Sequence, residues 1–207
     1  SGAHGLAILG LGTEVGKLSA DERASVLDWT SADLDGRLPL TVTVAEQTTS
    51  AAIAMVRAAE RADAACVILQ PPATKGLPEE EYIGFFGAIA DAASIPVGVQ
   101  NAPEYTGIGL SLDGIVSMTR RHPNVRMLKA EGSALYARQI VEATQGRVQV
   151  FNGRCGLELT DNLRAGCSGM IPSIESMDVQ ARIFELMSAG GPDNEAQAEQ
   201  LYAQILP

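Results

Sequence analysis

Short apolar runs alternate along the chain with longer stretches in which apolar residues recur at helical spacing. The short runs predict seven strands, at residues 5–10, 40–45, 66–70, 96–101, 125–129, 148–152 and 169–172. The longer stretches predict helices at residues 20–34, 49–62, 79–93, 112–121, 133–144, 157–165 and 178–189, with a last helix at 195–205. Local signals agree, because Ser19 and Glu22 form a capping-box pattern and Pro39 and Pro96 open strands.

The predicted strands are continuous apolar runs and not alternations of apolar and polar residues. Such runs are typical of strands that are covered on both faces, as in a parallel sheet. Repeated strand–helix units predict a parallel sheet with right-handed crossovers. An open doubly wound sheet is the alternative, but no glycine-rich dinucleotide fingerprint follows any predicted strand. We therefore predict an α/β protein with a (β/α)8 TIM-barrel fold, of which seven units are present.

The composition excludes several classes of function. With 207 residues, 46% of them hydrophobic, the chain can build one sizeable core, and its net charge of -10 argues against nucleic acid as a partner. No apolar run reaches the length of a membrane span, and no signal peptide precedes the first strand, so we expect a cytoplasmic protein without a membrane partner.

The cysteines and histidines narrow the chemistry further. Cys66, Cys155 and Cys167 lack the spacing of a metal site, and we expect them to be buried thiols in a reducing compartment. His4 and His122 are the only histidines, and His122 lies in a polar helix end that we expect at the surface. A histidine-based triad or a multi-histidine metal site is therefore hard to build, and we expect neither a metal nor a cofactor.

Lys129 is one of three lysines, and it ends the predicted strand at 125–129. A buried, unpaired ammonium is costly, and burial lowers the pKa of an amine and makes it a nucleophile toward carbonyl groups. The alternative is that Lys129 points into water at the end of its strand. The other predicted strands also end in polar segments, at residues 10–14, 70–72, 100–107, 152–154 and 171–175. In a barrel these segments meet at one mouth, which favours a functional lysine.

Four segments, taken in order, resemble one known family. Their residues are Gly10, Glu14, Leu18-Ser19 and Glu22-Arg23; then 101–107; then Leu128-Lys129 before Glu131-Gly132; then Asn152-Gly153 and 166–171. In this order and spacing they are similar to the motifs of the dihydrodipicolinate synthase / N-acetylneuraminate lyase family of class I, Schiff-base aldolases.

The resemblance implies a (β/α)8 barrel and a small C-terminal helical extension, which we place at residues 1–190 and 191–207. It implies that Lys129 condenses with the ketone of pyruvate or another 2-oxo acid, in a homotetramer or a dimer. In the family a strand and a helix precede the Gly10 segment, and further helices follow the last segment. We therefore expect the first barrel strand to be missing and the extension to be truncated, as in a fragment of a longer polypeptide.

The chain also departs from the family pattern. The paired hydroxyls that hold the oxo acid's carboxylate fall on Leu11 and Gly12, and the second glycine of that motif is Thr13. The relay tyrosine before Asn101 is replaced by Gln100. The tyrosine pair after an earlier strand falls on Pro72 and Ala73, and Tyr105 stands where some synthases have an arginine. An ordinary dihydrodipicolinate synthase is therefore not expected.

Other residues at the strand ends are candidates for the missing roles. For proton transfer we name Glu131, Tyr105 and Glu175, where the alternative for Glu131 is a solvated turn. Arg154 is the candidate clamp for a carboxylate, and its alternative is a surface ion pair. The remaining candidates for substrate binding are Gly12, Thr13, Gln100, Asn101 and Ser173.

The sequence thus predicts a Schiff-base-forming lyase, either an aldolase or a dehydratase. Its substrate would be a 2-oxo acid such as pyruvate or a 2-keto-3-deoxy sugar acid. Two alternatives stay open: a dihydrodipicolinate synthase with an altered proton relay, and a non-catalytic paralogue that binds an oxo acid.

Overall fold

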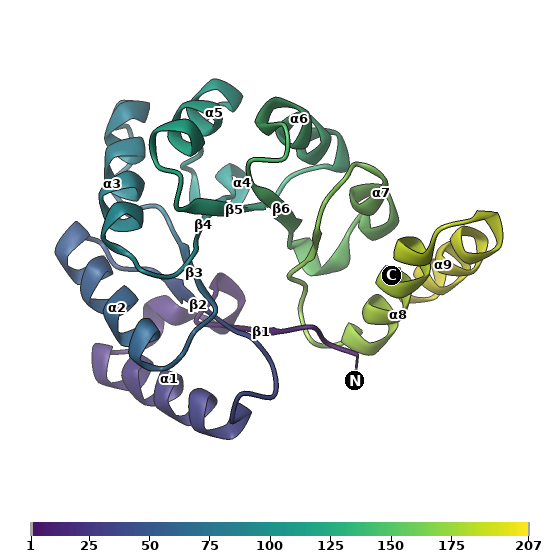
Figure 1. The fold of residues 1–207 in the computed structure, drawn as a ribbon, viewed down its shortest axis with the longest axis horizontal. Coiled ribbons are helices and arrows are strands. Elements are labelled where there is room, and N and C mark those ends of the chain that lie inside the picture. The colour runs from purple at the N-terminus through teal and green to yellow at the C-terminus, as the bar shows by residue number, and fades with distance from the viewer. Residues whose placement is uncertain (1, 207) are drawn as a thin grey trace.

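Seven parallel strands form one sheet, in which each strand pairs with the next along the chain (Figure 1). The computed structural model describes residues 2–206. The strands are β1 (Leu6–Ile8), β2 (Leu40–Val44), β3 (Cys66–Leu69), β4 (Val97–Asn101), β5 (Val125–Ala130), β6 (Gln149–Asn152) and β7 (Gly169–Met170). The helices are α1 (Ala20–Leu34), α2 (Thr49–Arg61), α3 (Glu79–Ala92), α4 (Pro103–Thr106), α5 (Leu112–Arg121), α6 (Ala134–Thr144), α7 (Leu159–Arg164), α8 (Met177–Ala189) and α9 (Pro192–Ile205).

The strands form an inner arc, and α1, α2, α3, α5, α6 and α7 follow one another around its outside (Figure 1). Within residues 2–206, β1 and β7 pair with no further strand, so the arc has seven of the eight strands of a closed barrel. The predicted barrel architecture is confirmed, and every predicted strand is present. The sheet order excludes the doubly wound alternative, in which the strand order reverses.

The two faces of the sheet bury different side chains. The outer face packs against the helices through Val42, Val67, Val97, Leu128 and Val150, which are almost fully buried in one large core. On the inner face side chains from neighbouring strands interlock, because a Cβ placed on Gly98 would lie 3.1 Å from Ile68 Cγ1 and 3.2 Å from Met127 Sδ. Alternation along each strand therefore decides which residues can reach the barrel interior.

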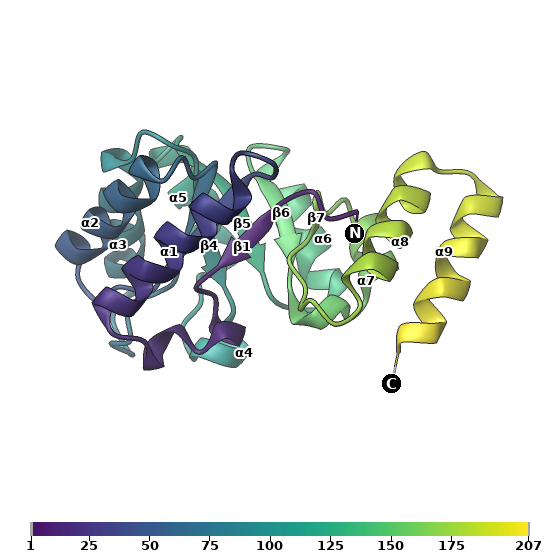
Figure 2. The same cartoon turned by 90° about the horizontal axis from the view of Figure 1, so that it is seen from below.

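The C-terminal helices form a second, smaller core. α8 and α9 lie side by side at one end of the molecule, where Ile183, Leu186, Ala198 and Tyr202 pack together with Leu159 of α7 (Figure 2). The N-terminal segment also reaches α8, since the rings of His4 and Phe184 lie 5.2 Å apart in an edge-on arrangement. The proposed division into residues 1–190 and 191–207 stays a prediction.

Several details differ from the sequence-based expectations. α9 begins at Pro192 and not at residue 195, because proline suits the first turn of a helix. The short helix α4 and the 3-10 turns η1 (Leu11–Thr13), η2 (Val15–Lys17) and η3 (Arg154–Gly156) were not predicted, since they lack a full helical period. The predicted capping box is confirmed: Ser19 Oγ accepts from Glu22 N, and Glu22 Oε2 accepts from Ser19 N.

Two predictions about single side chains were wrong. His122 was expected at the surface, but its side chain is only 14% exposed and lies over Gly87, with Nδ1 3.0 Å from the carboxylate of Asp91. Cys155 was expected to be buried, but it is exposed in the turn η3, whereas Cys66 and Cys167 are buried. In the part of the chain that the structure describes, none of the helices combines the length and the hydropathy needed to cross a membrane.

Candidate functional site

Lys129 points to the inner face of the sheet, near the carboxyl end of β5. Its neighbours in sequence, Leu128 and Ala130, are fully buried on the helix side, so the side chain between them takes the opposite face. Its partners across the sheet are Gln100 on β4 and Phe151 on β6. The side chain is 13% exposed, so the ammonium is largely removed from water and needs a partner.

Glu131 is that partner. It follows Lys129 by two residues, and its Oε1 lies 3.1 Å from Lys129 Nζ. The other oxygen, Oε2, accepts a hydrogen bond from Gln100 Nε2. One carboxylate thus holds both the amine and the amide, and all three side chains are largely buried. Lys129 and Glu131 thus lie on the same side of the strand, as their separation of two residues allows, and the solvated alternatives for both residues are wrong.

The side chain of Asn101 fixes the loop between β4 and α5 through hydrogen bonds. Its Oδ1 accepts from Leu110 N at 2.8 Å, and its Nδ2 donates to Leu110 O at 3.1 Å and to Tyr136 Oη at 2.6 Å. The side chain is 2% exposed and fixes the segment that carries α4. Burial raises the pKa of the Tyr136 phenol, although the hydrogen bond with Asn101 acts in the opposite direction.

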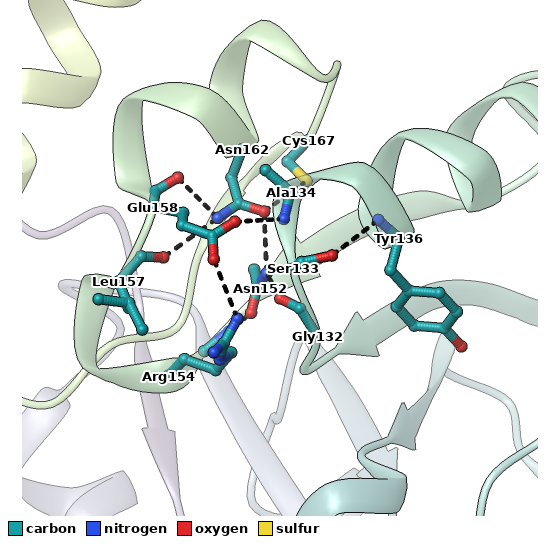
Figure 3. Close-up of polar contacts among 11 residues, drawn as sticks. Gly132, Ser133, Ala134, Tyr136, Asn152, Arg154, Leu157, Glu158, Asn162 and Cys167 are labelled. Carbon is teal, nitrogen blue, oxygen red and sulfur yellow. Dashed lines mark hydrogen bonds and ion pairs between the residues drawn. The ribbon is translucent and has the colours of Figure 1, made fainter.

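The segment after β6 is held by two buried asparagines (Figure 3). Asn152 Nδ2 donates to Gly132 O at 2.9 Å and to Asn162 Oδ1 at 2.8 Å, which ties β6 to the turn after Glu131. Asn162 Nδ2 in turn donates to Leu157 O at 3.2 Å and to Glu158 O at 2.7 Å. Both asparagines have no exposed surface, so these bonds fix the loop against α7 from inside.

Arg154 lies in this loop and faces Glu158 (Figure 3). Its Nη1 is 3.4 Å from Glu158 Oε1, while Glu158 Oε2 accepts from Ala134 N, at the start of α6, at 2.6 Å. Arg154 Nε is buried without a hydrogen-bond partner among the described residues. Arg154, Cys155 and Glu158 all have φ between 49° and 56°, a left-handed conformation that is costly for residues other than glycine. The loop therefore stores strain beside the strand ends.

The remaining predicted site residues do not join the Lys129 group. Within residues 2–206, no hydrogen bond or ion pair connects them to Lys129, Glu131 or Gln100. Tyr105 is 56% exposed on α4, and Gly12 and Thr13 lie in the exposed turn η1, where Thr13 Oγ1 donates to Gly10 O. Glu175 is exposed, and a hydrogen bond from Ser173 lowers the pKa of its carboxyl. Their roles stay predictions.

Several residues that shape the site were not among the predicted site residues, although Gln70 and Gly153 lie in the polar segments expected at the strand ends. Gln70 follows β3 at the carboxyl end of the sheet, and it is only 7% exposed. Gly153 lies against Glu131 and Lys129, and Asn162 and Glu158 hold the loop after β6. A glycine directly after a strand is a signal of close approach that could have been used. Within the described residues, no group of three or more His, Cys, Asp and Glu side chains could hold a metal ion.

Comparison with known proteins finds relatives that are named as dehydratases and synthases. The chain is 28% identical over 200 residues to the L-2-keto-3-deoxyarabonate dehydratase of Azospirillum brasilense, an alignment that covers 94% of this chain and 64% of the dehydratase. It is also 28% identical over 204 residues to the 4-hydroxy-tetrahydrodipicolinate synthase of Methanococcoides burtonii, covering 98% of this chain and 69% of the synthase. The chain thus spans about two thirds of the length of these relatives.

Solved structures show the same fold. YagE from E. coli K12, a prophage protein of the dihydrodipicolinic acid synthase family solved in complex with pyruvate, superposes with a TM-score of 0.90 at 22% identity. The match covers 98% of this chain and 68% of YagE. A family model, that of the dihydrodipicolinate synthetase family, matches residues 1–207. The chain therefore belongs to the dihydrodipicolinate synthetase family.

Proposed function

We propose that the protein is a Schiff-base-forming lyase that acts on a 2-oxo acid. The observation that carries this proposal is the buried pair of Lys129 Nζ and Glu131 Oε1, 3.1 Å apart at the carboxyl end of a barrel strand. Barrel enzymes place their chemistry at that end, and an amine paired with a carboxylate can give up a proton and attack a carbonyl. Membership of the family supports this reading of Lys129.

The first stage of the reaction uses both members of the pair. Glu131 takes a proton from the ammonium of Lys129, and the neutral amine attacks the C2 ketone of the oxo acid. Glu131 returns that proton to the hydroxyl of the resulting carbinolamine, which leaves as water, and an iminium forms between Nζ and C2. The iminium withdraws electrons from C3, so a C3 proton becomes acidic, and its removal by Glu131 gives an enamine.

In the second stage the enamine expels a leaving group. In a 2-keto-3-deoxy sugar acid the C4 hydroxyl takes up a proton and leaves as water, after which hydrolysis of the iminium releases the product and restores Lys129. Aldol cleavage would instead start from the iminium: removal of the proton of the C4 hydroxyl breaks the C3–C4 bond, and the electron pair of that bond gives the enamine. We favour dehydration. Its support is that Glu131 Oε1 lies 3.1 Å from Lys129 Nζ, close to where the imine would form, and that the Azospirillum brasilense relative is named a dehydratase.

Other residues supply binding in this proposal. Arg154 clamps the carboxylate of the oxo acid. Its buried Nε, which has no hydrogen-bond partner among residues 2–206, supports this role. Gln100 orients Glu131. Tyr105 and Glu175 remain candidates for proton transfer, and the remaining candidates for substrate binding are Ser173, Asn101, Gly12 and Thr13. We further propose a cytoplasmic homo-oligomer, either a tetramer or a dimer.

Borohydride trapping tests the proposal. The protein is mixed with pyruvate or a 2-keto-3-deoxy sugar acid and sodium borohydride, and its intact mass is measured. The parent should gain the mass of the reduced adduct, and Lys129→Ala should not. Lys17→Ala, which removes an exposed lysine paired with Glu14, is the matched control and should behave as the parent does. Absence of any adduct in the parent across a panel of 2-oxo acids would refute the lyase, whereas an adduct without turnover would favour the non-catalytic paralogue.

A further inference from the structure

Gln70 and Gln100 lie side by side at the carboxyl ends of β3 and β4. Leu69 is the sheet partner of Val99, so the next residue on each strand, Gln70 and Gln100, occupies the next paired position. Both follow by two residues a position on the inner face, Ile68 and Gly98, and therefore share that face.

Each of these amides has a buried polar atom without a partner. Gln70 Nε2 and Gln100 Oε1 make no hydrogen bond with any residue in 2–206. The two side chains are only 7% and 2% exposed, so neither atom is well solvated. An unsatisfied buried donor or acceptor is costly, and two beside each other at a strand end indicate a place where a polar group binds.

The two amides extend the row of polar side chains that contains the lysine. Gln100 donates through Nε2 to Glu131, and Glu131 pairs with Lys129, so the row runs from β5 across β4 to β3. Neighbouring strands are about 4.8 Å apart, which places β3 about 10 Å from β5. A group that meets both glutamines lies between β3 and β4, about 7 Å from β5. It therefore lies beyond the C2 atom that Lys129 holds, and a three-carbon acid is too short to supply it.

A hydroxyl has the chemistry that this place requires. It accepts one hydrogen bond and donates another, so it satisfies the donor Gln70 Nε2 and the acceptor Gln100 Oε1 together. A second carboxylate does not fit, because it donates nothing to Gln100 Oε1 and is repelled by the neighbouring Glu131. A methyl group would leave both amides unsatisfied.

We propose that Gln70 and Gln100 form a subsite for a hydroxyl group, and that the substrate is a 2-oxo acid with a neutral hydroxylated chain at C4 or beyond. This inference rests on the proposed function and makes Gln70 a residue that determines specificity. Hydroxylated sugar acids fit the subsite, whereas pyruvate fills the lysine position alone.

A matched pair of probes tests this inference in the unmodified protein. The probes are 4,5-dihydroxy-2-oxopentanoate and 2-oxopentanoate, which share a carbon chain and differ in the hydroxyls. The concentration that half-saturates the rate of borohydride trapping is measured for each. The hydroxylated probe should half-saturate at a concentration lower by at least ~10-fold, as the loss of a satisfied buried hydrogen bond predicts.

Substitution of Gln70 then tests whether this residue causes the preference for the hydroxylated probe. Gln70→Met keeps the length of the side chain and removes its amide, so the preference for the hydroxylated probe should fall to about one. Gln149→Met makes the same change at the exposed start of β6 and should keep the preference. Equal half-saturation by the two probes in the parent, or an unchanged preference in folded Gln70→Met, would overturn the subsite. Either result would leave the lyase standing, since an adduct still forms, whereas absence of every adduct refutes the lyase itself.

Discussion

A Cβ atom on Gly153 would lie 2.3 Å from Oε1 of Glu131, the oxygen that pairs with Lys129, and 3.2 Å from Lys129 Cε. The first distance is far below van der Waals contact, so no side chain fits at position 153 without moving the carboxylate. The glycine after β6 therefore sets the space in which the amine and the carboxylate meet. The backbone of one strand end shapes the chemistry at the end of its neighbour.

We therefore expect Gly153→Ala to displace Glu131 and to lower turnover by at least ~10-fold, with a loss of stability of about 1–3 kcal/mol from overpacking. Gly84→Ala is the matched control, because a Cβ there meets nothing within 4 Å and Gly84 lies in the exposed face of α3. The control should keep its activity and gain about 0.5–1 kcal/mol, as alanine favours helices. Urea unfolding and steady-state kinetics measure both effects. Full activity in Gly153→Ala would contradict this view of the glycine.

Glu131→Gln should separate imine formation from turnover. The amide keeps the shape of the carboxylate but cannot take a proton, so turnover should fall by ~10²–10⁴-fold, the usual contribution of a general base. Borohydride should still trap some pyruvate, because Lys129 remains. Glu46→Gln removes another partly buried carboxylate, paired with Arg23 at 3.4 Å, and should leave turnover near that of the parent. A variant at 131 with ordinary turnover would exclude Glu131 as the base.

The sequence predicted the strands and the direction of Lys129 because both depend on local patterns. Continuous apolar runs identified the strands, and the polar segments that follow them placed Lys129 at the mouth of the barrel. The pairing of Lys129 with Glu131 also followed from their separation of two residues along the strand. The apolar runs and this separation each lie within one short segment of the chain, so they needed no long-range information.

The neighbours of the lysine across the sheet were harder to predict. Gln100 reaches Glu131 and Gln70 lies beside Gln100 only because of the register of β3, β4 and β5. The contact of Arg154 with Glu158 depends on a loop with left-handed residues, which no pattern in the sequence indicates. The exposure of single side chains was also predicted poorly from the sequence, since the ring of His122 packs on Gly87 of another helix.

Gly87 and His122 should therefore show a strong energetic coupling. A Cβ on Gly87 would lie 2.2 Å from His122 Nε2, so Gly87→Ala should lower the free energy of unfolding by about 1–3 kcal/mol, although alanine is the better helix former. In a His122→Ala background the ring is absent, and the same Gly87→Ala change should be neutral or stabilising. Urea unfolding of the two single variants and the double variant measures the coupling. Additive effects would mean that the ring moves aside freely.

The carboxylate of Glu60 should make stability depend on pH. The backbone N–H of Ser94 and the guanidinium of Arg57 hold the pKa of Glu60 at about 2, below its ordinary value of 4.5. A lowered pKa means that this contribution is fully present above the ordinary value and is lost as the pH falls toward the folded value. The stability difference between the parent and Glu60→Gln should thus be constant near neutral pH and shrink between about pH 4.5 and pH 2.

Urea unfolding across this range provides the measurement. Glu104→Gln is the control, because the exposed Glu104 has no side-chain hydrogen bond or ion pair with any residue in 2–206. A difference for Glu60→Gln that stays the same down to pH 2 would show that the hydrogen bond from Ser94 does not favour the charged form.

Arg154→Lys tests whether the guanidinium binds the substrate's carboxylate or only its own loop. Lysine keeps the positive charge but loses the planar fork that binds a carboxylate with two parallel hydrogen bonds. If Arg154 is the anchor, the half-saturating concentration of the 2-oxo acid should rise by at least ~10-fold. The melting temperature should change little, because a pair at 3.4 Å with a partly exposed Glu158 contributes only about 0–1 kcal/mol.

Two further variants separate this view from a structural one. Arg164→Lys weakens the ion pairs of Arg164 with Asp161 on α7 and with Glu195 and Glu199 on α9. It should therefore lower the melting temperature and leave the half-saturating concentration unchanged. Glu158→Gln removes the loop partner of Arg154 and keeps the guanidinium. If Arg154 serves only the loop, Glu158→Gln and Arg154→Lys should affect half-saturation alike. If it holds the substrate, only Arg154→Lys should weaken binding, because Glu158→Gln releases the guanidinium from a competing carboxylate and leaves it free to pair with the oxo acid.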